Sequence, residues 1–119
     1  MEDLELLVVV DHRMSATAEF ADYVIAPTLS LERADVPHLM DRWFRAPYTN
    51  YTEAVTPRIG DVLNEWEVFW ELARRLGSPL PFPGGEAPMD ERPTDDDMLD
   101  LVYAGSRMPL DEVRRQRMK

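Results

Sequence analysis

Hydrophobic residues in the first part of the chain gather into two short runs. Residues 4–10 are apolar on both faces apart from one glutamate, which predicts a strand covered on both sides, as in a parallel sheet. Residues 23–26 form a second apolar run that ends at Pro27. The alanine-rich stretch between them, residues 15–22, favours a short helix. We therefore expect an α/β fold that begins with two short parallel strands.

The strongest helical pattern covers Glu65 to Leu76. Asn64 can cap its start, and Gly77 can end it. One face is apolar, and we expect it to cover one side of the strand pair through Trp66, Phe69, Ala73 and Leu76.

The segments around this helix carry weaker signals. Residues 28–60 have no long period, so they predict a long ordered excursion with at most one short helix, near residues 36–44. Residues 80–93 hold four prolines and two glycines, which indicates an irregular, exposed connector.

Two further helices are predicted near the C-terminus. Thr94, followed by three aspartates, opens a helix that reaches about Ala104. These aspartates, residues 95–97, could also be a catalytic or cation-binding group, but acids in a first helical turn are explained by the helix dipole. Pro109 marks the start of a last helix, which ends in arginines.

Composition narrows the class of protein. The chain has 119 residues, which suits one domain, and it has no cysteine, which excludes disulfides and thiolate metal sites. Its net charge of −10 argues against a nucleic-acid partner. The longest apolar run is far shorter than a bilayer span, and the acidic N-terminus is unlike a secretory signal. A soluble, cytoplasmic protein without a membrane partner is the expectation.

Reactive groups are scarce. His12 and His38 are the two imidazoles, and neither has a second histidine at helical spacing, so we expect no metal site. No nucleophile elbow and no glycine-rich phosphate loop is present. The residues alone therefore predict part of a nucleotide-type α/β fold, with no catalytic residue.

A set of short segments resembles the molybdopterin oxidoreductases, the family of DMSO reductase, formate dehydrogenase and nitrate reductase. The first similar segment, residues 6–12, is a strand that ends in Asp11, and the second, residues 17–27, holds Thr-Ala, Ala-Asp and a short strand with Pro27. An acid followed by a base comes at residues 31–33. A loop with valine, proline, glycine and an acid covers residues 51–61, and a helix covers residues 64–77. The similarity covers residues 4–77. Residues 78–119 resemble a more variable insert.

The resemblance implies a fragment of a longer enzyme, part of its third, Rossmann-like domain. That domain holds one guanosine end of the bis-molybdopterin guanine dinucleotide cofactor. Residues 1–77 would be a partial cofactor-binding α/β domain with two parallel strands, and residues 78–119 a proline-rich connector with C-terminal helices. The family's iron–sulfur cysteines and molybdenum ligand have no counterpart here, so we expect no turnover by the chain alone.

Four positions match cofactor-contacting positions of the family. Val10 and Asp11 match the strand-end pair that meets the guanine and ribose, Arg33 a basic residue near the phosphates or base, and Glu65 an acid at the start of the long helix. Each also has a plain structural interpretation, such as a strand-ending cap for Asp11 or a surface charge for Arg33.

Two other functions stay open. The chain could be a small acidic interaction module or adaptor subunit with no catalysis, or a small hydrolase that uses carboxylates. Partners are expected to be the remaining domains of the parent oxidoreductase or a second copy of the chain. The substrate and the choice between molybdenum and tungsten are determined by residues outside this chain.

Overall fold

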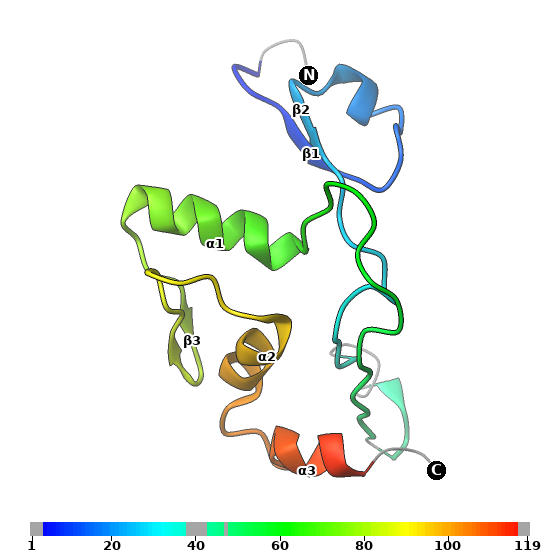
Figure 1. The fold of residues 1–119 in the computed structure, drawn as a ribbon, viewed down its shortest axis with the longest axis vertical. Helices are drawn as coiled ribbons and strands as arrows, with labels where there is room; N and C mark the ends of the chain where they lie inside the picture. The colour runs from blue at the N-terminus through cyan, green and yellow to red at the C-terminus, as the bar shows by residue number, and fades with distance from the viewer. Residues whose placement is uncertain (1–3, 38–42, 47, 117–119) are drawn as a thin grey trace.

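Figure 1 shows the computed structural model of the chain, which describes residues 4–37, 43–46 and 48–116. Strands β1 (Val8–Val10) and β2 (Tyr23–Ile25) pair in parallel, as predicted, although each is shorter than the apolar run that contains it. Between them lies a single 3-10 turn, η1 (Ala18–Phe20), where a short helix was expected. The mixed α/β composition is confirmed.

The excursion after β2 runs outward and returns. Pro27 forms a parallel bridge with Leu63, and Asp35 forms an antiparallel bridge with Thr52, so the outgoing and returning segments lie side by side. In Figure 1 they cross each other between the strand pair and the lower part of the molecule. The helix expected near residues 36–44 falls largely outside the described residues.

Helix α1 (Glu65–Leu76) has the predicted bounds. The Glu67 carboxylate accepts a hydrogen bond from the Asn64 backbone N–H at 2.6 Å, as in a capping box. Gly77 ends the helix with φ +63°, a left-handed conformation that glycine adopts without strain.

The expected packing of α1 on the strand pair is wrong. Phe69 is 61% and Leu76 71% exposed, whereas Trp70 and Ala73 are buried. Trp70 belongs to a cluster with Ala87 and Met98, so α1 packs towards the C-terminal segments, and Figure 1 shows it between the strand pair and those segments. Helical spacing identified the apolar residues but could not tell which of them would be covered.

Residues 80–93 are more ordered than expected. They contain a small antiparallel hairpin of β3 (Pro81–Phe82) and β4 (Gly85–Glu86), followed by the buried Ala87. Gly84 donates its N–H to the Leu101 carbonyl at 2.9 Å. A Cβ at Gly84 would meet Ala104 Cβ at 2.9 Å, so glycine lets the hairpin lie directly against α2.

Helices α2 (Asp95–Tyr103) and α3 (Leu110–Arg115) confirm the two C-terminal helices predicted. The Thr94 hydroxyl accepts from the Asp97 N–H at 3.2 Å, as expected of an N-cap. A second small core joins α3 to the excursion through Val36, Leu110 and Val113. None of the described helices is long and apolar enough to cross a membrane.

Candidate functional site: the carboxyl edge of the parallel strands

Asp11 lies at the carboxyl end of β1, where the strand turns away from the sheet. Its backbone N–H still donates to the Ile25 carbonyl at 3.1 Å, which fixes it beside the end of β2. Its carboxylate accepts from the Arg13 N–H at 3.2 Å. A hydrogen bond from the Ser15 hydroxyl, that backbone bond and the nearby His12 and Arg13 lower the pKa of Asp11, so the side chain is an anion at neutral pH.

The start of α1 lies at this same edge. The Leu63 N–H donates to the Ala26 carbonyl, and the Thr28 N–H donates to the Leu63 carbonyl, both at 3.0 Å. Leu63 thereby forms a parallel bridge with Pro27, just beyond the end of β2, and Glu65 follows two residues later as the first residue of α1. Ligands of open α/β sheets bind at the carboxyl ends of strands, which is where these elements meet.

The four positions taken from the family resemblance are not equivalent in the structure. Val10 is the last residue of β1 and Asp11 directly follows it, whereas Glu65 is exposed at the start of α1. Arg33 lies on the excursion and pairs with Asp35 at 3.3 Å. No hydrogen bond or ion pair joins Asp11, Arg33 and Glu65 to one another within the described residues.

Thr28 is a residue at this edge that the sequence pattern did not single out. It is 4% exposed, and its hydroxyl has no hydrogen-bond partner among the described residues. Buried polar atoms in proteins nearly always have a partner. A threonine after a short apolar strand gives no warning of this in the sequence.

A second polar cluster, also missed by sequence reasoning, stabilises the start of α1. Arg58 donates to both carboxylate oxygens of the buried Glu67 at 2.9 Å, and to Asp95 at 3.2 Å. The same Asp95 accepts from the Trp66 indole N–H at 2.8 Å and from the Asn64 amide at 3.0 Å. These contacts tie the loop before α1, the first turn of α1 and the first turn of α2 together.

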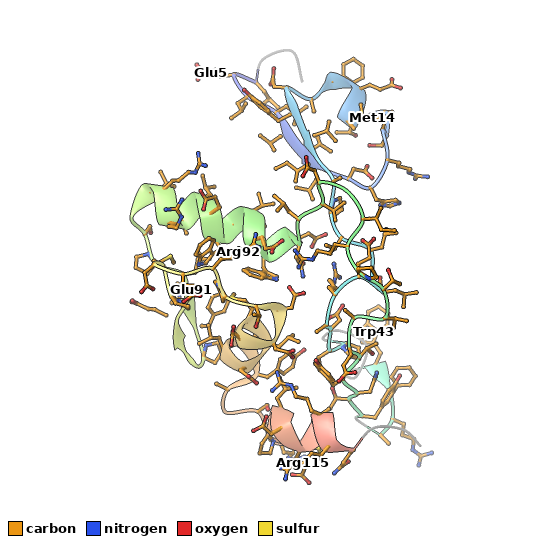
Figure 2. All side chains as sticks on the ribbon, viewed as in Figure 1. Glu5, Met14, Trp43, Glu91, Arg92 and Arg115 are labelled. Atoms are coloured by element: carbon orange, nitrogen blue, oxygen red, sulfur yellow. The ribbon has the colours of Figure 1, made fainter. Side chains whose placement is uncertain are left out.

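Charges around this cluster are balanced. Arg92, which Figure 2 labels beside α1, lies 3.7 Å from the Glu67 carboxylate. The hydrogen bonds and charges of Glu67 and Asp95 raise the pKa of Arg58 against the opposing effect of its own burial, the largest single cause. Since each acid already has a cation or donor, the cluster is suited to positioning α1 rather than to proton transfer.

Metal-ligating groups do not gather in the described part of the chain, where no three His, Asp or Glu residues are placed to hold one ion. His12 is exposed and lies 3.6 Å from the Asp11 carboxylate. His38 lies outside the described residues.

Three curated proteins are similar to this chain. Formate dehydrogenase H of Escherichia coli (strain K12) is 33% identical over 90 residues, which are 76% of this chain and 12% of that protein. Acetylene hydratase of Syntrophotalea acetylenica is 34% identical over 79 residues, 66% of this chain and 10% of that protein. The dimethyl sulfoxide/trimethylamine N-oxide reductase of Cereibacter sphaeroides is 34% identical over 92 residues, 74% of this chain and 10% of that protein.

The chain thus spans about an eighth or less of the length of the curated relatives it matches. No family model matches it, and no solved structure matches it either. The three relatives are all molybdopterin oxidoreductases. The family resemblance predicted from the sequence is confirmed: the chain is similar to a segment of the molybdopterin oxidoreductases.

Proposed function

We propose that the chain is the part of a molybdopterin oxidoreductase that holds a guanosine end of the bis-molybdopterin guanine dinucleotide, without a complete active site of its own. The observation that carries this proposal is the position of Asp11, an ionised carboxylate at the carboxyl end of a parallel strand, next to the bridge that leads into α1. The cofactor would supply the redox chemistry, and this chain would bind and orient its nucleotide.

The donors and acceptors at this edge fit a guanine. An ionised carboxylate can accept hydrogen bonds from the guanine N1–H and amino group, and charge-assisted bonds of this kind are strong. Val10 would contact the nucleotide beside Asp11, and Glu65 would approach it from the start of α1. The unpartnered Thr28 hydroxyl is a further polar group at this edge. Arg33 would need to leave Asp35 to reach a phosphate.

Uncovered apolar surface supports the view that the chain functions as part of a larger assembly. Val8 and Val10 share one face of β1, and they are 44% and 38% exposed. β1 pairs with β2 alone among the described strands, so its other edge is open. Parallel sheets are normally covered on both faces.

Helix α1 shows the same incompleteness. Phe69, Leu72 and Leu76 form an exposed apolar stripe beside its buried face. A helix whose apolar surface is wider than the part it buries is typical of an element that also packs against a second layer. We propose that the remaining domains of the parent enzyme cover these surfaces. Self-association, or a role as an acidic interaction module without catalysis, is the second candidate that the same surfaces favour.

Titration of the chain with GDP, followed by amide chemical shifts, tests the nucleotide site. We expect saturable shifts centred on Val10, Asp11 and Glu65, with affinity no better than about millimolar because only part of the site is present. ADP should bind more weakly, since adenine has no N1–H and no 2-amino group, the two adjacent donors that a carboxylate would pair with in guanine.

Two variants make this test specific. Asp11→Asn can still accept the turn hydrogen bond from Arg13 but loses the ionised acceptor, so it should remove the preference for GDP over ADP. Asp90→Ala, at an exposed acid without a hydrogen bond or ion pair among the described residues, should leave the preference unchanged. Equal binding of the two nucleotides by the unaltered chain would overturn the proposed site.

A further inference from the structure

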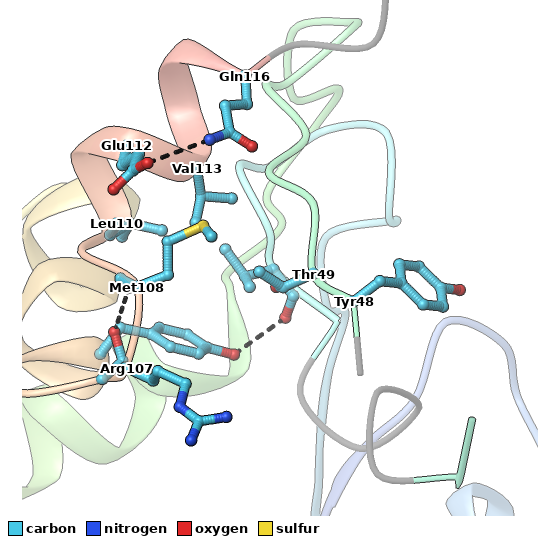
Figure 3. A pocket seen from close by; sticks show the side chains of 11 residues that line it. Tyr48, Thr49, Arg107, Met108, Leu110, Glu112, Val113 and Gln116 are labelled. Atoms are coloured by element: carbon cyan, nitrogen blue, oxygen red, sulfur yellow. Dashed lines mark hydrogen bonds between the residues drawn. The ribbon is translucent and has the colours of Figure 1, made fainter. Parts of the chain in front are cut away.

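A pocket of about 600 Å³ lies at the opposite end of the molecule from Asp11, between α3 and the excursion. Figure 3 shows Met108, Leu110 and Val113 on one side of it, and Tyr48 and Thr49 on the other. The pocket size lies within the range of small-molecule sites.

Part of the pocket lining is apolar. Leu110 and Val113 belong to the buried core that includes Val36. Met108 and Tyr48, which also line it, are 41% and 53% exposed. Large apolar side chains that remain exposed around a concavity mark a binding site more often than isolated ones do.

One cation lines the pocket without a partner. Arg107 forms no ion pair within the described residues, whereas Arg58, Arg74 and Arg114 each contact carboxylates. A guanidinium fork matches a carboxylate in a two-point arrangement.

A negative group limits the charge of the ligand. Glu112 also lines the pocket, its carboxylate accepts from the Gln116 amide at 3.2 Å, and Figure 3 places both at the far end from Arg107. Because this carboxylate lines the pocket, a ligand that carries several negative charges is disfavoured at this site.

We propose that this pocket binds a small organic monoanion, an apolar body that carries one carboxylate, with Arg107 pairing with the carboxylate. The apolar body would lie against Met108, Leu110 and Val113. The inference does not depend on the proposed cofactor role, because the two sites share no residue and lie at different ends of the fold.

The test uses the whole chain and three probes: 3-phenylpropionate, its uncharged amide and benzyl phosphate. We expect 3-phenylpropionate to give saturable amide shifts at Ser106, Met108 and Val113. The amide should bind at least about tenfold more weakly, as the loss of one hydrogen bond to a charged group requires. Benzyl phosphate, with its greater negative charge, should bind less well than the carboxylate.

Arg107→Gln should remove the difference between the acid and its amide. Arg13→Gln, a matched change at another exposed arginine outside the pocket, should leave that difference intact. Absence of saturable shifts, equal binding of acid and amide by the unaltered chain, or tighter binding of benzyl phosphate would each overturn the proposal. Because GDP is read out at Val10, Asp11 and Glu65, failure here is distinguishable from failure of the nucleotide site.

Discussion

Arg58 and Glu67 form an ion pair in which one guanidinium nitrogen lies 2.9 Å from each carboxylate oxygen. The Glu67 side chain is 5% exposed and the Arg58 side chain 30% exposed, so the pair is largely shielded from water. Glu67 also accepts from the Asn64 backbone N–H. The Glu67 carboxylate therefore accepts hydrogen bonds both from Arg58, in the loop before α1, and from Asn64, the residue that caps α1.

Glu67→Gln should lower the free energy of unfolding by about 1.5–3 kcal/mol, the range for hydrogen bonds to a charged group. The neutral amide keeps one acceptor oxygen for Asn64 but removes the buried charge that pairs with Arg58, which retains Asp95. Urea unfolding followed by tryptophan fluorescence measures the loss. Glu71→Gln is the matched control, because Glu71 also pairs with arginines but at the exposed surface, where such pairs contribute little. Equal losses in both variants would contradict this account.

The pH dependence of α1 should depend on Glu71. Hydrogen bonds from Arg74 and Arg75 lower the pKa of Glu71 from 4.5 to about 2. A carboxyl pKa that is lower in the folded state stabilises that state above the unfolded pKa, here by a small amount because the pairs are exposed, and this stabilisation is lost as pH falls from 4.5 towards about 2. A carbon-detected NMR titration should give a Glu71 midpoint near that lower value. A midpoint close to 4.5, or an unchanged acid response in Glu71→Gln, would refute the pairing.

Arg114 should be a main determinant of how α3 docks. Its guanidinium lies 2.7 Å from Asp100, 3.0 Å from Asp96 and 3.2 Å from Asp111, and 5.3 Å from the centre of the Tyr51 ring. A lysine cannot reproduce a planar fork that reaches several acids and an aromatic face at once. Arg114→Lys should therefore cost about 1–2 kcal/mol of unfolding free energy, the range expected for losing one or two such bonds.

The control for this change is Arg115→Lys on the same helix. Arg115 donates to the Asp111 carbonyl from an exposed position, so its replacement should alter stability little. Urea midpoints of the two variants, compared at one salt concentration, give the difference. A larger loss in the Arg115 variant would contradict the role assigned to Arg114.

The open face of β1 should promote association. We expect concentration-dependent sedimentation of the isolated chain, because Val8 and Leu6 are exposed beside an unpaired strand edge. The double change Leu6→Thr and Val8→Thr should shift the chain towards monomer. Leu29→Thr, at an exposed leucine outside the strand pair, should not. A clean monomer of the unaltered chain at all concentrations would end this argument.

Local signals in the sequence were sufficient for the helices. Asn64 marks the start of α1, Gly77 marks its end, and Thr94 marks the start of α2. These positions were predictable because capping depends on residues only a few positions apart. The parallel strand pair was predicted for a similar reason: two apolar runs separated by a short polar stretch leave few alternatives.

Contacts between distant segments were not predictable in this way. Arg58 meets Asp95 across 37 positions, and neither residue has a local pattern that identifies the other. The hairpin at residues 81–86 was missed because prolines and glycines are typical of irregular loops. The packing side of α1 was wrong because Phe69 and Trp70 are both large and apolar, and only the tertiary partners distinguish them.

The same principle limits the candidate site. Asp11 was placed correctly at the end of a strand because the change from valines to an aspartate is visible in the sequence. The unpartnered Thr28 hydroxyl depends on the bridge between Pro27 and Leu63, 36 positions apart, which no local pattern reveals. Whether Asp11 and Glu65 act on one nucleotide stays a prediction.

The burial of Trp70 against Ala87 and Met98 has a consequence for synthesis on the ribosome. A nascent chain that has emerged only as far as Gly77 already contains every capping signal of α1, but neither Ala87 nor Met98, the buried side chains that pack with its indole. About twenty more residues must therefore be synthesised before α1 can bury Trp70. During that interval the exposed tryptophan can contact chaperones or neighbouring nascent chains. Slow translation between codons 78 and 98 would lengthen that exposure, whereas slow translation after codon 98 would not.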